Sequence, residues 1–204
     1  MSYYIGIDLG GTNIVSAVVT DKYEILAKAS VPTAMPRDAA SIFDDIAKTG
    51  FEAVEKAGLT MDDIEWIGLG TPGTVNQKNG YIEYANNLKF DNIPARDMLQ
   101  DRFHKTVYLE NDANCAALGE AIAGSGHGTP NFVAVTLGTG VGSGVIINSN
   151  IITGVNFAGG EWGHMVIVKD GEPCGCGRHG CWEAYASATA LIRQTIASMN
   201  KNPN

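Results

Sequence analysis

A short pattern occurs twice in this chain: a β run ends in a glycine turn, and a second apolar run follows. The segment IGIDLGGT (Ile5–Thr12) resembles the segment VAVTLGTG (Val133–Gly140). Leu9 matches Leu137 at an offset of 128 residues (137 − 9). The shared strand–turn–strand context favours duplication over chance. We therefore expect two related halves, each of which begins with a β-hairpin.

The repeat also predicts how much of the second half the chain contains. Residue 204 corresponds to residue 76 of the first copy (204 − 128). If the two copies are equally long, the chain stops midway through the second one. We therefore expect a fragment of a longer protein, with reduced or no activity of its own.

Composition narrows the class of protein. Apolar residues make up 45% of the 204 residues and charged residues 18%, which is typical of a globular chain. The net charge of −8 argues against a nucleic-acid-binding surface. The first residues have no signal-peptide pattern, and no run approaches the roughly 18 apolar residues of a membrane helix. We expect a cytoplasmic protein that binds neither nucleic acid nor membrane.

Hydrophobic periodicity predicts a mixed α/β chain. Strands are expected at residues 3–8, 14–19, 25–31, 64–69, 107–109, 132–137 and 143–147, and helices at 42–54, 113–123 and 184–199. Gly58 should end the first helix. Residues 77–94 are expected to be rich in loops. The Gly10-Gly11 pair predicts a tight hairpin turn, because such turns need positive φ angles.

The two glycine turns, Gly10-Gly11-Thr12 and Gly138-Thr139-Gly140, are candidates for binding phosphate. Phosphate needs backbone N–H donors at close range, and glycine leaves room for that approach. Neither turn is a P-loop, because no Gly-Lys-Ser/Thr follows. The alternative is two plain hairpins without a ligand. The pairing of the turns favours a phosphate clamp, in which Asp8 could bind Mg²⁺ through water.

A polar pair, Asn111-Asp112, lies between an expected strand and an expected helix. One interpretation makes Asp112 the N-cap of that helix. Another makes it a base that faces an attacking hydroxyl. Several polar residues favour the second interpretation, because amides and carboxylates hydrogen-bond the hydroxyls of a sugar. These residues are Asn86, Asn111, Glu161, His164 and Glu183.

The segment CGCGRHGC (Cys174–Cys181) is the strongest local signal in the chain. Its three cysteines, Cys174, Cys176 and Cys181, offer soft ligands that can wrap around one Zn²⁺, and the glycines between them let the chain curl. Spacing alone leaves His164 and His179 as alternatives for the fourth ligand. The remaining cysteine, Cys115, is expected to be a small buried residue of a helix.

Five motifs, in order along the chain, resemble the ROK sugar kinases, and most closely their glucokinase branch. They are DLGGT (Asp8–Thr12), ENDAN (Glu110–Asn114), LGTG (Leu137–Gly140), EWGH (Glu161–His164) and CGCGRHGCWE (Cys174–Glu183), of which the last is the signature of the family. The resemblance implies an α/β, ribonuclease-H-like (actin-like ATPase) fold with two lobes, the second of them incomplete. It implies a small N-terminal α/β lobe at residues 1–112 and a partial large lobe, with a zinc-binding loop, at residues 113–204.

The same resemblance implies ATP-dependent phosphorylation of a hexose at its 6-hydroxyl, with Mg²⁺ and with glucose as the expected sugar. Asp112 would be the catalytic base, and the full-length parent a homo-oligomer. The implied sugar contacts are Gly73, Asn86, Asn111, Asp112, Glu161, His164 and Glu183. The implied contacts to the nucleotide phosphates are Asp8, Gly10, Gly11, Thr12, Gly138, Thr139 and Gly140. The implied zinc ligands are His164, Cys174, Cys176 and Cys181.

Two alternatives stay open on the sequence. One is a kinase for another sugar, such as fructose, N-acetylmannosamine or allose. The other is a non-catalytic sugar-binding or regulatory member of the same family. Repressors of the family carry an N-terminal DNA-binding helical segment, whereas the first strand here is expected to start at Tyr3. The sugar residues and the zinc loop argue against an actin-like or chaperone ATPase.

Overall fold

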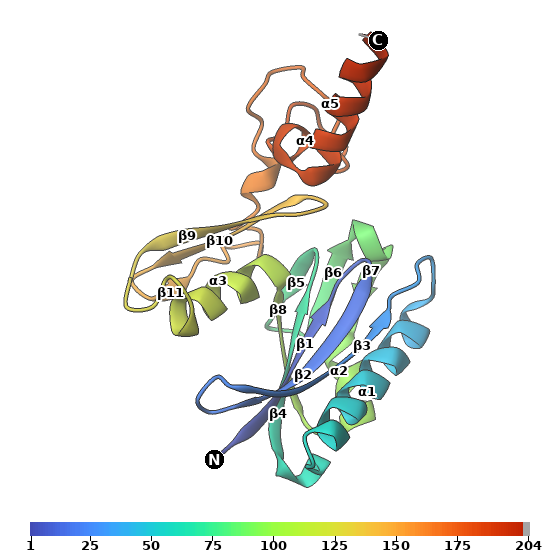
Figure 1. The fold of residues 1–204 in the computed structure, drawn as a ribbon, viewed down its shortest axis with the longest axis vertical. Coiled ribbons are helices and arrows are strands. Elements are labelled where there is room, and N and C mark those ends of the chain that lie inside the picture. The colour runs from blue at the N-terminus through green and yellow to red at the C-terminus, as the bar shows by residue number, and fades with distance from the viewer. Residues whose placement is uncertain (202–204) are drawn as a thin grey trace. The chain divides into compact units, whose positions relative to one another are not determined.

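The computed structural model describes residues 1–201 and divides the chain into two compact units (Figure 1). The first unit is Met1–Cys115 and the second is Ala116–Asn204. Each unit has its own sheet or sheets, so each is described separately. Within residues 1–201, no helix has both the length and the apolar character needed to cross a membrane.

The first unit contains a five-stranded sheet, a three-stranded sheet and two helices. Its elements are β1 (Tyr3–Leu9), β2 (Asn13–Thr20), β3 (Ile25–Pro32), α1 (Ala39–Lys56), a 3₁₀ turn (Met61–Asp63), β4 (Ile64–Thr71), β5 (Thr74–Asn76), β6 (Tyr81–Ala85), a 3₁₀ turn (Asn86–Leu88), β7 (Phe90–Ile93), α2 (Ala95–Phe103) and β8 (Thr106–Asn111). Helix α3 (Asp112–Ala123) starts in this unit and continues into the second.

The five-stranded sheet has the order β3-β2-β1-β4-β8. Strands β1, β2 and β3 are antiparallel neighbours, whereas β4 and β8 run parallel to β1. In the parallel part, Asp8 pairs with Gly70, and Gly70 pairs with Glu110. Because parallel strands end at the same edge of a sheet, the residues that follow β1, β4 and β8 are brought to one edge.

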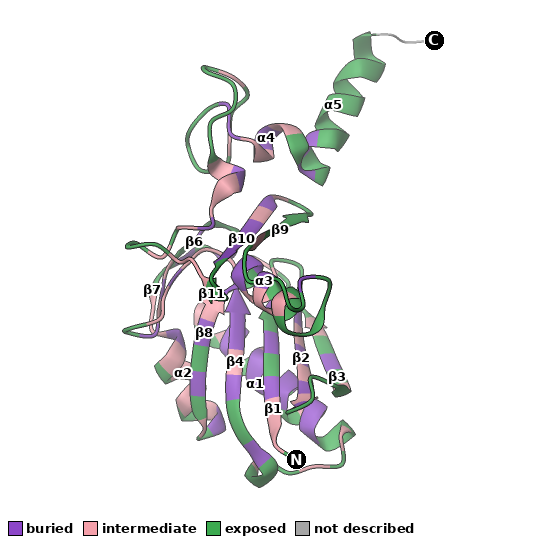
Figure 2. Cartoon of the chain, turned by 90° about the vertical axis from the view of Figure 1, so that its left-hand side faces the viewer, coloured by how far each residue is buried: buried purple, intermediate pink, exposed green. Residues whose placement is uncertain are grey.

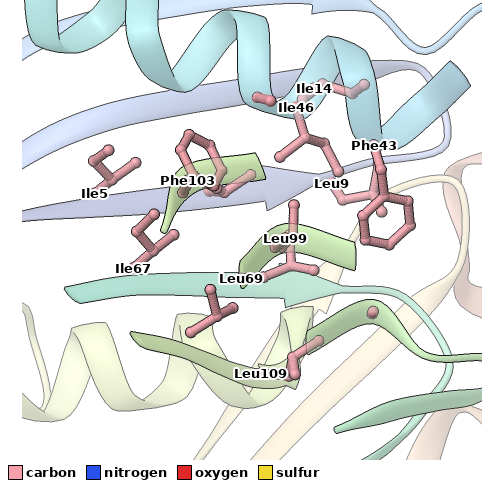
Figure 3. Packing of buried hydrophobic residues seen from close by; sticks show 14 of the residues in the cluster. Ile5, Leu9, Ile14, Phe43, Ile46, Ile67, Leu69, Leu99, Phe103 and Leu109 are labelled. Carbon is pink, nitrogen blue, oxygen red and sulfur yellow. The ribbon is translucent and has the colours of Figure 1, made fainter. Parts of the chain in front are cut away.

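The core of the first unit lies between this sheet and the helices α1 and α2. Side chains alternate along a strand, so every second residue of β1, including Ile5 and Leu9, is buried. Figure 3 shows these side chains in one cluster with Phe43 and Ile46 of α1, and with Leu99 and Phe103 of α2. The apolar contact between sheet and helices fixes the register of the strands, since a shift by one residue would expose the buried set.

Helix α1 follows the expected pattern closely. Its N-cap is Asp38, whose carboxylate accepts a hydrogen bond from the Ser41 N–H at 2.9 Å. Its buried face includes Ile42, Phe43 and Ile46. Gly58 has a φ of 70° just beyond the helix, so the predicted stop is confirmed.

The expectation of loops at residues 77–94 is wrong. The segment forms β6 and β7, which pair with each other and with β5 in an antiparallel sheet. Strands of three to five residues are too short to show a clear alternation in the sequence. Helix α2 was also not anticipated, because only Ala95, Leu99 and Phe103 are buried along it.

The second unit contains a smaller sheet, a long irregular loop and two helices. Its elements are β9 (Phe132–Leu137), β10 (Val141–Ile147), β11 (Asn150–Ile151), a 3₁₀ turn (Trp162–His164), α4 (Glu183–Ala186) and α5 (Ala188–Lys201). The helix expected at residues 184–199 is therefore broken. Ser187 adopts an extended conformation, and its Oγ accepts a hydrogen bond from the Ala190 N–H at 3.1 Å. This bond caps α5, which is exposed along most of its length (Figure 2).

Both predicted hairpins are present, and they lie in similar sheets. The order β11-β10-β9 in the second unit repeats the order β3-β2-β1 in the first. The equivalent side chains differ in solvent exposure. Ile5 and Leu9 of β1 are 0% exposed, whereas Val133 and Leu137 of β9 are 40% and 66% exposed. Among the residues described, β9 has no strand on its outer side, whereas β1 pairs with β4 there.

The packing of α1 on α2 predicts an unusual effect of a helix glycine. A Cβ on Gly50 would lie 2.6 Å from Cζ of Phe103, whose buried ring also packs on Phe51 at a centroid distance of 5.1 Å. Alanine normally favours a helix by about 1 kcal/mol over glycine. We expect Gly50→Ala to lower the free energy of unfolding by about 1–2 kcal/mol, because overpacking outweighs that gain.

Urea unfolding followed by circular dichroism measures this change, with Gly119→Ala as the control. Gly119 also lies in a helix, but a Cβ there would meet no atom within 4 Å. The control should be neutral or up to about 1 kcal/mol more stable. Equal stabilities for the two variants would show that Phe103 does not constrain position 50.

Candidate functional site

The first glycine turn connects β1 to β2, whose last pair is Leu9 with Ile14. The turn forms as predicted, but the reason given for it is wrong, because neither Gly10 nor Gly11 has a positive φ. Glycine is favoured at position 10 because a Cβ would lie only 3.0 Å from the Asn13 carbonyl oxygen, which is tighter than an ordinary contact. The Gly10 N–H donates to that same oxygen at 2.9 Å.

Thr33, which follows β3 and is fully buried, braces this turn. Its hydroxyl donates to the Gly10 carbonyl at 2.7 Å, and its N–H donates to the Thr12 carbonyl at 2.8 Å. Carbonyl oxygens repel an anion, so their engagement by Thr33 leaves the turn better suited to a phosphate than a free hairpin would be. No sequence pattern points to Thr33, because it lies far from the turn along the chain.

The second glycine turn, between β9 and β10, is braced in a similar way. The Ala188 N–H donates to the Gly138 carbonyl at 2.9 Å, and the Thr189 hydroxyl donates to the Thr139 carbonyl at 2.7 Å. A Cβ on Gly140 would collide with the carboxylate of Glu183. Both turns therefore have two carbonyls bound by a threonine hydroxyl and a backbone N–H, so the likeness of the two copies extends to how their turns are held.

The turn between β8 and α3 presents Asp112. The expected alternative, Asp112 as the N-cap, is wrong: Asn111 caps the helix, and Asp112 is its first residue. The Asn111 Oδ1 accepts hydrogen bonds from the N–H groups of Ala113 at 3.0 Å and Asn114 at 3.2 Å. Its Nδ2 donates to the Gly73 carbonyl at 3.1 Å, which ties the turn to the loop after β4. The Asp112 Oδ1 also accepts a hydrogen bond from the Ala113 N–H at 2.9 Å, while Asn111 makes the capping bonds further into the helix.

The pKa values of the Asp8 and Asp112 carboxyl groups are both raised. Burial raises the pKa of Asp112 above its ordinary value, even though the side chain reaches the surface, because protein atoms displace much of the surrounding water. Burial also raises the pKa of Asp8, and the negative charge of Asp112 adds to that shift. A raised pKa makes a carboxylate a better proton acceptor, and two neighbouring carboxylates favour a cation or a proton between them.

Gly73 and Asn86, two further expected sugar contacts, lie beside this turn. Gly73 has a φ of 91°, and a Cβ there would collide with the Tyr84 carbonyl oxygen, so only glycine fits. Asn86 follows β6 and is exposed, and its Oδ1 accepts hydrogen bonds from the Tyr84 hydroxyl at 3.3 Å and Lys89 Nζ at 3.4 Å. The first unit thus gathers Gly73, Asn111 and Asp112 by direct contacts, with Asn86 on the adjoining segment.

In the second unit, His164 lies with the three cysteines of the CGCGRHGC segment. The ligand atoms of His164, Cys174, Cys176 and Cys181 are all within 4.8 Å of one another. The Cys176 and Cys181 sulfurs are 3.7 Å apart, and Cys174 Sγ is 3.5 Å from His164 Nδ1. Sulfurs bound to Zn²⁺ at about 2.3 Å in a tetrahedron lie about 3.8 Å apart. The spacing of the four groups therefore fits a tetrahedral zinc ion.

The chain curls around this cluster because of its glycines. Gly177 and Gly180 have φ angles of 85° and 78°, which glycine adopts without strain. The Cys174 N–H donates to the Arg178 carbonyl at 2.8 Å, which closes the loop. His179, the other histidine that spacing allowed, pairs through its backbone with Pro173 instead.

Glu161 and Glu183 flank the cysteine cluster. Glu161 precedes the 3₁₀ turn that carries His164, and the His164 N–H donates to its carbonyl at 3.1 Å. The Glu183 carboxylate accepts from the Val141 N–H at 3.0 Å and lies 3.8 Å from Cys174 Sγ. Glu183 thus connects the second glycine turn to the cysteines, which places Gly140, Glu183 and the cluster in one part of the unit.

Cys115 stands apart from the other three cysteines. Burial raises the pKa of its thiol to about 12, and the negative charges of Glu110, Asp112 and Asp8 add to this shift. The side chain packs where a Cβ on Gly70 would lie 3.2 Å from its sulfur. Its predicted place on a helix is confirmed, since it lies on α3, but its side chain is only partly buried.

Comparisons with known proteins agree with this arrangement. The sequence profile of the ROK family matches residues 4–203. Glucokinases from Halalkalibacterium halodurans and Thermotoga maritima are 40% and 38% identical to 94% and 93% of this chain, which spans 58% of each. The xylose repressor of Bacillus subtilis is 32% identical to 94% of the chain, which spans 49% of that protein.

Solved structures give the same result. The ROK family glucokinase of Streptomyces griseus, in complex with glucose and AMPPNP, matches with a TM-score of 0.88 and 39% identity. That match covers 99% of this chain and 62% of the glucokinase. The ROK hexokinase of Thermus thermophilus matches 97% of the chain with a TM-score of 0.81 and 35% identity. The expected actin-like ATPase fold is therefore confirmed, and the chain belongs to the ROK family.

Proposed function

We propose that this chain is part of an ATP-dependent sugar kinase, with glucose as the first candidate substrate and its 6-hydroxyl as the acceptor. The observation that carries this proposal is Asp112, a carboxylate with a raised pKa on the turn at the edge where β1, β4 and β8 end. Ligands of open α/β sheets bind at such carboxyl-terminal edges. The glucokinase relatives, one of them in complex with glucose and AMPPNP, support the same activity.

In the proposed reaction, Asp112 orients the sugar hydroxyl and accepts its proton as the hydroxyl oxygen attacks the γ-phosphorus of ATP. Phosphoryl transfer depends mainly on positioning and on charge stabilisation. A base with a raised pKa suits this role, because it takes the proton more readily than an ordinary aspartate. Asn111 keeps the Asp112 turn in place through its bonds to α3 and to Gly73.

The two braced glycine turns are the proposed phosphate contacts. Gly10, Gly11 and Thr12 in the first turn, and Gly138, Thr139 and Gly140 in the second, offer backbone N–H groups and threonine hydroxyls. Asp8, at the end of β1, is the proposed partner of Mg²⁺, which keeps much of its water shell and neutralises phosphate charge when bound. A divalent cation near Asp8 would also offset its repulsion from Asp112.

The proposed sugar contacts form two sets, each of which is described within its own unit. Gly73, Asn86, Asn111 and Asp112 would supply them from the first unit, and Glu161, His164 and Glu183 from the second. Amide and carboxylate groups recognise sugar hydroxyls by hydrogen bonds, and a site built for such bonds discriminates strongly against analogues that lack them.

We also propose that His164, Cys174, Cys176 and Cys181 bind one Zn²⁺. The His164 ring nitrogen Nδ1 faces Cys174 at 3.5 Å, which leaves Nε2 for a sugar hydroxyl. The metal would fix the loop that carries His164, as structural zinc sites do elsewhere.

Two alternatives follow from the relatives. A Listeria monocytogenes protein related to N-acetylmannosamine kinases matches with a TM-score of 0.82 and 29% identity, so another hexose is a second candidate substrate. A xylose repressor of Caldicellulosiruptor bescii is 34% identical to 92% of the chain, so sugar binding without turnover is a further one. Cytoplasmic location, oligomerisation and the absence of nucleic-acid binding stay predictions.

Replacing the proposed base tests the kinase assignment. Asp112→Asn keeps the shape of the side chain but removes its capacity to take a proton. With glucose and MgATP, in an assay coupled to ADP release, we expect reduced turnover by the unchanged chain, as predicted for part of a longer kinase. We expect kcat to fall by about 10²- to 10⁴-fold in the variant, the usual contribution of a general base, with little change in KM.

The matched control is Asp101→Asn, which changes an exposed carboxylate on α2 and should leave kcat unchanged. Equal activity of Asp112→Asn and the unchanged chain would exclude Asp112 as the base. Binding of glucose by calorimetry, without any ADP release, would favour the sugar-sensing alternative.

Metal analysis tests the zinc proposal. The reduced protein should contain one Zn²⁺ per chain, measured by displacement into a chromogenic chelator. Cys181→Ser should lose most of this metal because it removes a ligand, whereas Cys115→Ser should keep it, since Cys115 lies outside the cluster. We expect chelation to weaken glucose binding by at least about tenfold, as loss of a supporting contact does at other metal sites.

Unchanged glucose affinity after complete removal of the metal would contradict the supporting role of the zinc. Equal metal loss in Cys115→Ser and Cys181→Ser would contradict the ligand assignment.

A further inference from the structure

Glu110 is the last charged residue of β8 and directly precedes the Asn111-Asp112 turn. It pairs with Gly70 of β4 in the parallel part of the five-stranded sheet, so its backbone position is set by the sheet. Its side chain is half-buried at the edge where β1, β4 and β8 end. The proposed function assigns it no role.

Three neutral donors converge on the Glu110 carboxylate. Oε1 accepts hydrogen bonds from the Asn111 N–H at 2.8 Å and from Asn114 Nδ2 at 3.0 Å. Oε2 accepts a hydrogen bond from Gln77 Nε2. Within residues 1–201, no basic side chain forms an ion pair with Glu110. The carboxylate is therefore held by three directed hydrogen bonds and not by an ion pair.

The two residues that donate to Oε1 lie on either side of Asp112 in the sequence. Asn111 stands before Asp112, and Asn114 stands two residues after it. Asn111 is in turn bonded to the N–H groups of Ala113 and Asn114 through its own side chain. Glu110 thus closes a ring of hydrogen bonds around the first turn of α3, and the backbone of Asp112 lies inside that ring.

The bond to Oε2 connects the same carboxylate to the segment that follows β5. Gln77 follows β5, and its carbonyl accepts a hydrogen bond from the guanidinium of Arg96 at the start of α2. Arg96 also donates its backbone N–H to the Gly80 carbonyl at 3.0 Å. Glu110 therefore connects a segment held by α2 to the turn that carries Asp112.

The Asn114 side chain shows that this contact is not incidental. Asn114 is buried, and its Oδ1 has no hydrogen-bond partner among the described residues, while its Nδ2 binds Glu110. An unpaired buried acceptor lowers stability. The Asn114 amide therefore has a disadvantage that only its bond to Glu110 offsets. Residues that lower stability without an evident packing gain are expected mainly at functional sites.

We propose that Glu110 is a positioning residue, which fixes the orientation of Asp112 through Asn111 and Asn114. This inference rests on the proposed function, in which Asp112 is the base. Misplacement of a base by a fraction of a bond length lowers the rate without weakening substrate binding in proportion. Loss of Glu110 therefore acts on kcat more than on KM.

Three variants separate positioning from general stability. Glu110→Ala removes all three bonds. Glu110→Gln keeps an oxygen for Asn111 and Asn114, and Gln77 can rotate its amide to accept from the new Nε2. Glu83→Ala is the matched control: it removes another carboxylate–amide bond of the first unit, from Asn76 Nδ2 at 2.8 Å.

Amide hydrogen exchange, measured residue by residue by NMR, reports the local stability of the Asn111-Asp112 turn without requiring enzyme activity. In Glu110→Ala we expect the Ala113 and Asn114 amides to exchange about tenfold faster, because Asn111 loses its support. Amides in β1 and β4 should be unaffected, and Glu110→Gln should restore protection. Unchanged exchange at Ala113 and Asn114, or equal acceleration throughout the sheet, would overturn the proposal.

The same variants are then assayed for sugar phosphorylation. We expect kcat to fall by about 10- to 100-fold in Glu110→Ala, with KM for the sugar within about threefold, and to recover largely in Glu110→Gln. Glu83→Ala should keep full activity. A Glu110→Ala enzyme with normal kcat would overturn the positioning role. Hydrogen exchange decides whether Glu110 orders the turn even if the unchanged chain shows no turnover, so failure of the positioning proposal and failure of the proposed function are distinguishable.

Discussion

The parallel pairing of β1, β4 and β8 is the constraint on which the first unit depends. It aligns Asp8 with Gly70, and Gly70 with Glu110, so the three strands end together. The segments that leave this edge carry Asp8, the loop of Gly73, and the turn of Asn111 and Asp112. Helices α1 and α2 cover the buried face of the sheet and hold that register (Figure 3). The register of the strands therefore determines which residues of the candidate site lie at the same edge of the sheet.

Placing two acidic groups at one edge has an electrostatic consequence. The pKa of Asp8 is raised by burial and by the charge of Asp112, so both carboxylates are more basic than they would be in water. The first N–H groups of a helix have no partner within the helix. Here the side chains of Glu110 and Asn111 accept hydrogen bonds from the N–H groups of Asn111, Ala113 and Asn114, so the backbone at the start of α3 is satisfied. An edge that carries two neighbouring carboxylates is suited to a cation and to a hydroxyl that must lose a proton.

Much of this arrangement could be predicted from the sequence, and the reasons for the failures are physical. Long periodic segments, such as α1 and the two hairpins, were found because their patterns extend over many residues. The short strands β6 and β7 and the helix α2 were missed because each has few buried residues. The preference for glycine at position 10 was attributed to φ, whereas the close approach of the Asn13 carbonyl decides it. The braces Thr33 and Thr189 were missed because contacts between distant segments leave no local pattern.

Direct observation of the product tests the central proposal, that the chain is part of a kinase that phosphorylates a sugar. Glucose labelled with ¹³C at C6 is incubated with the protein and MgATP, and the C6 resonance is followed by NMR. Transfer to the 6-hydroxyl predicts a new C6 signal split by coupling to ³¹P, which disappears when Asp112 is replaced by Asn. ATP hydrolysis with the C6 signal unchanged, or glucose binding with ATP intact, would contradict the account.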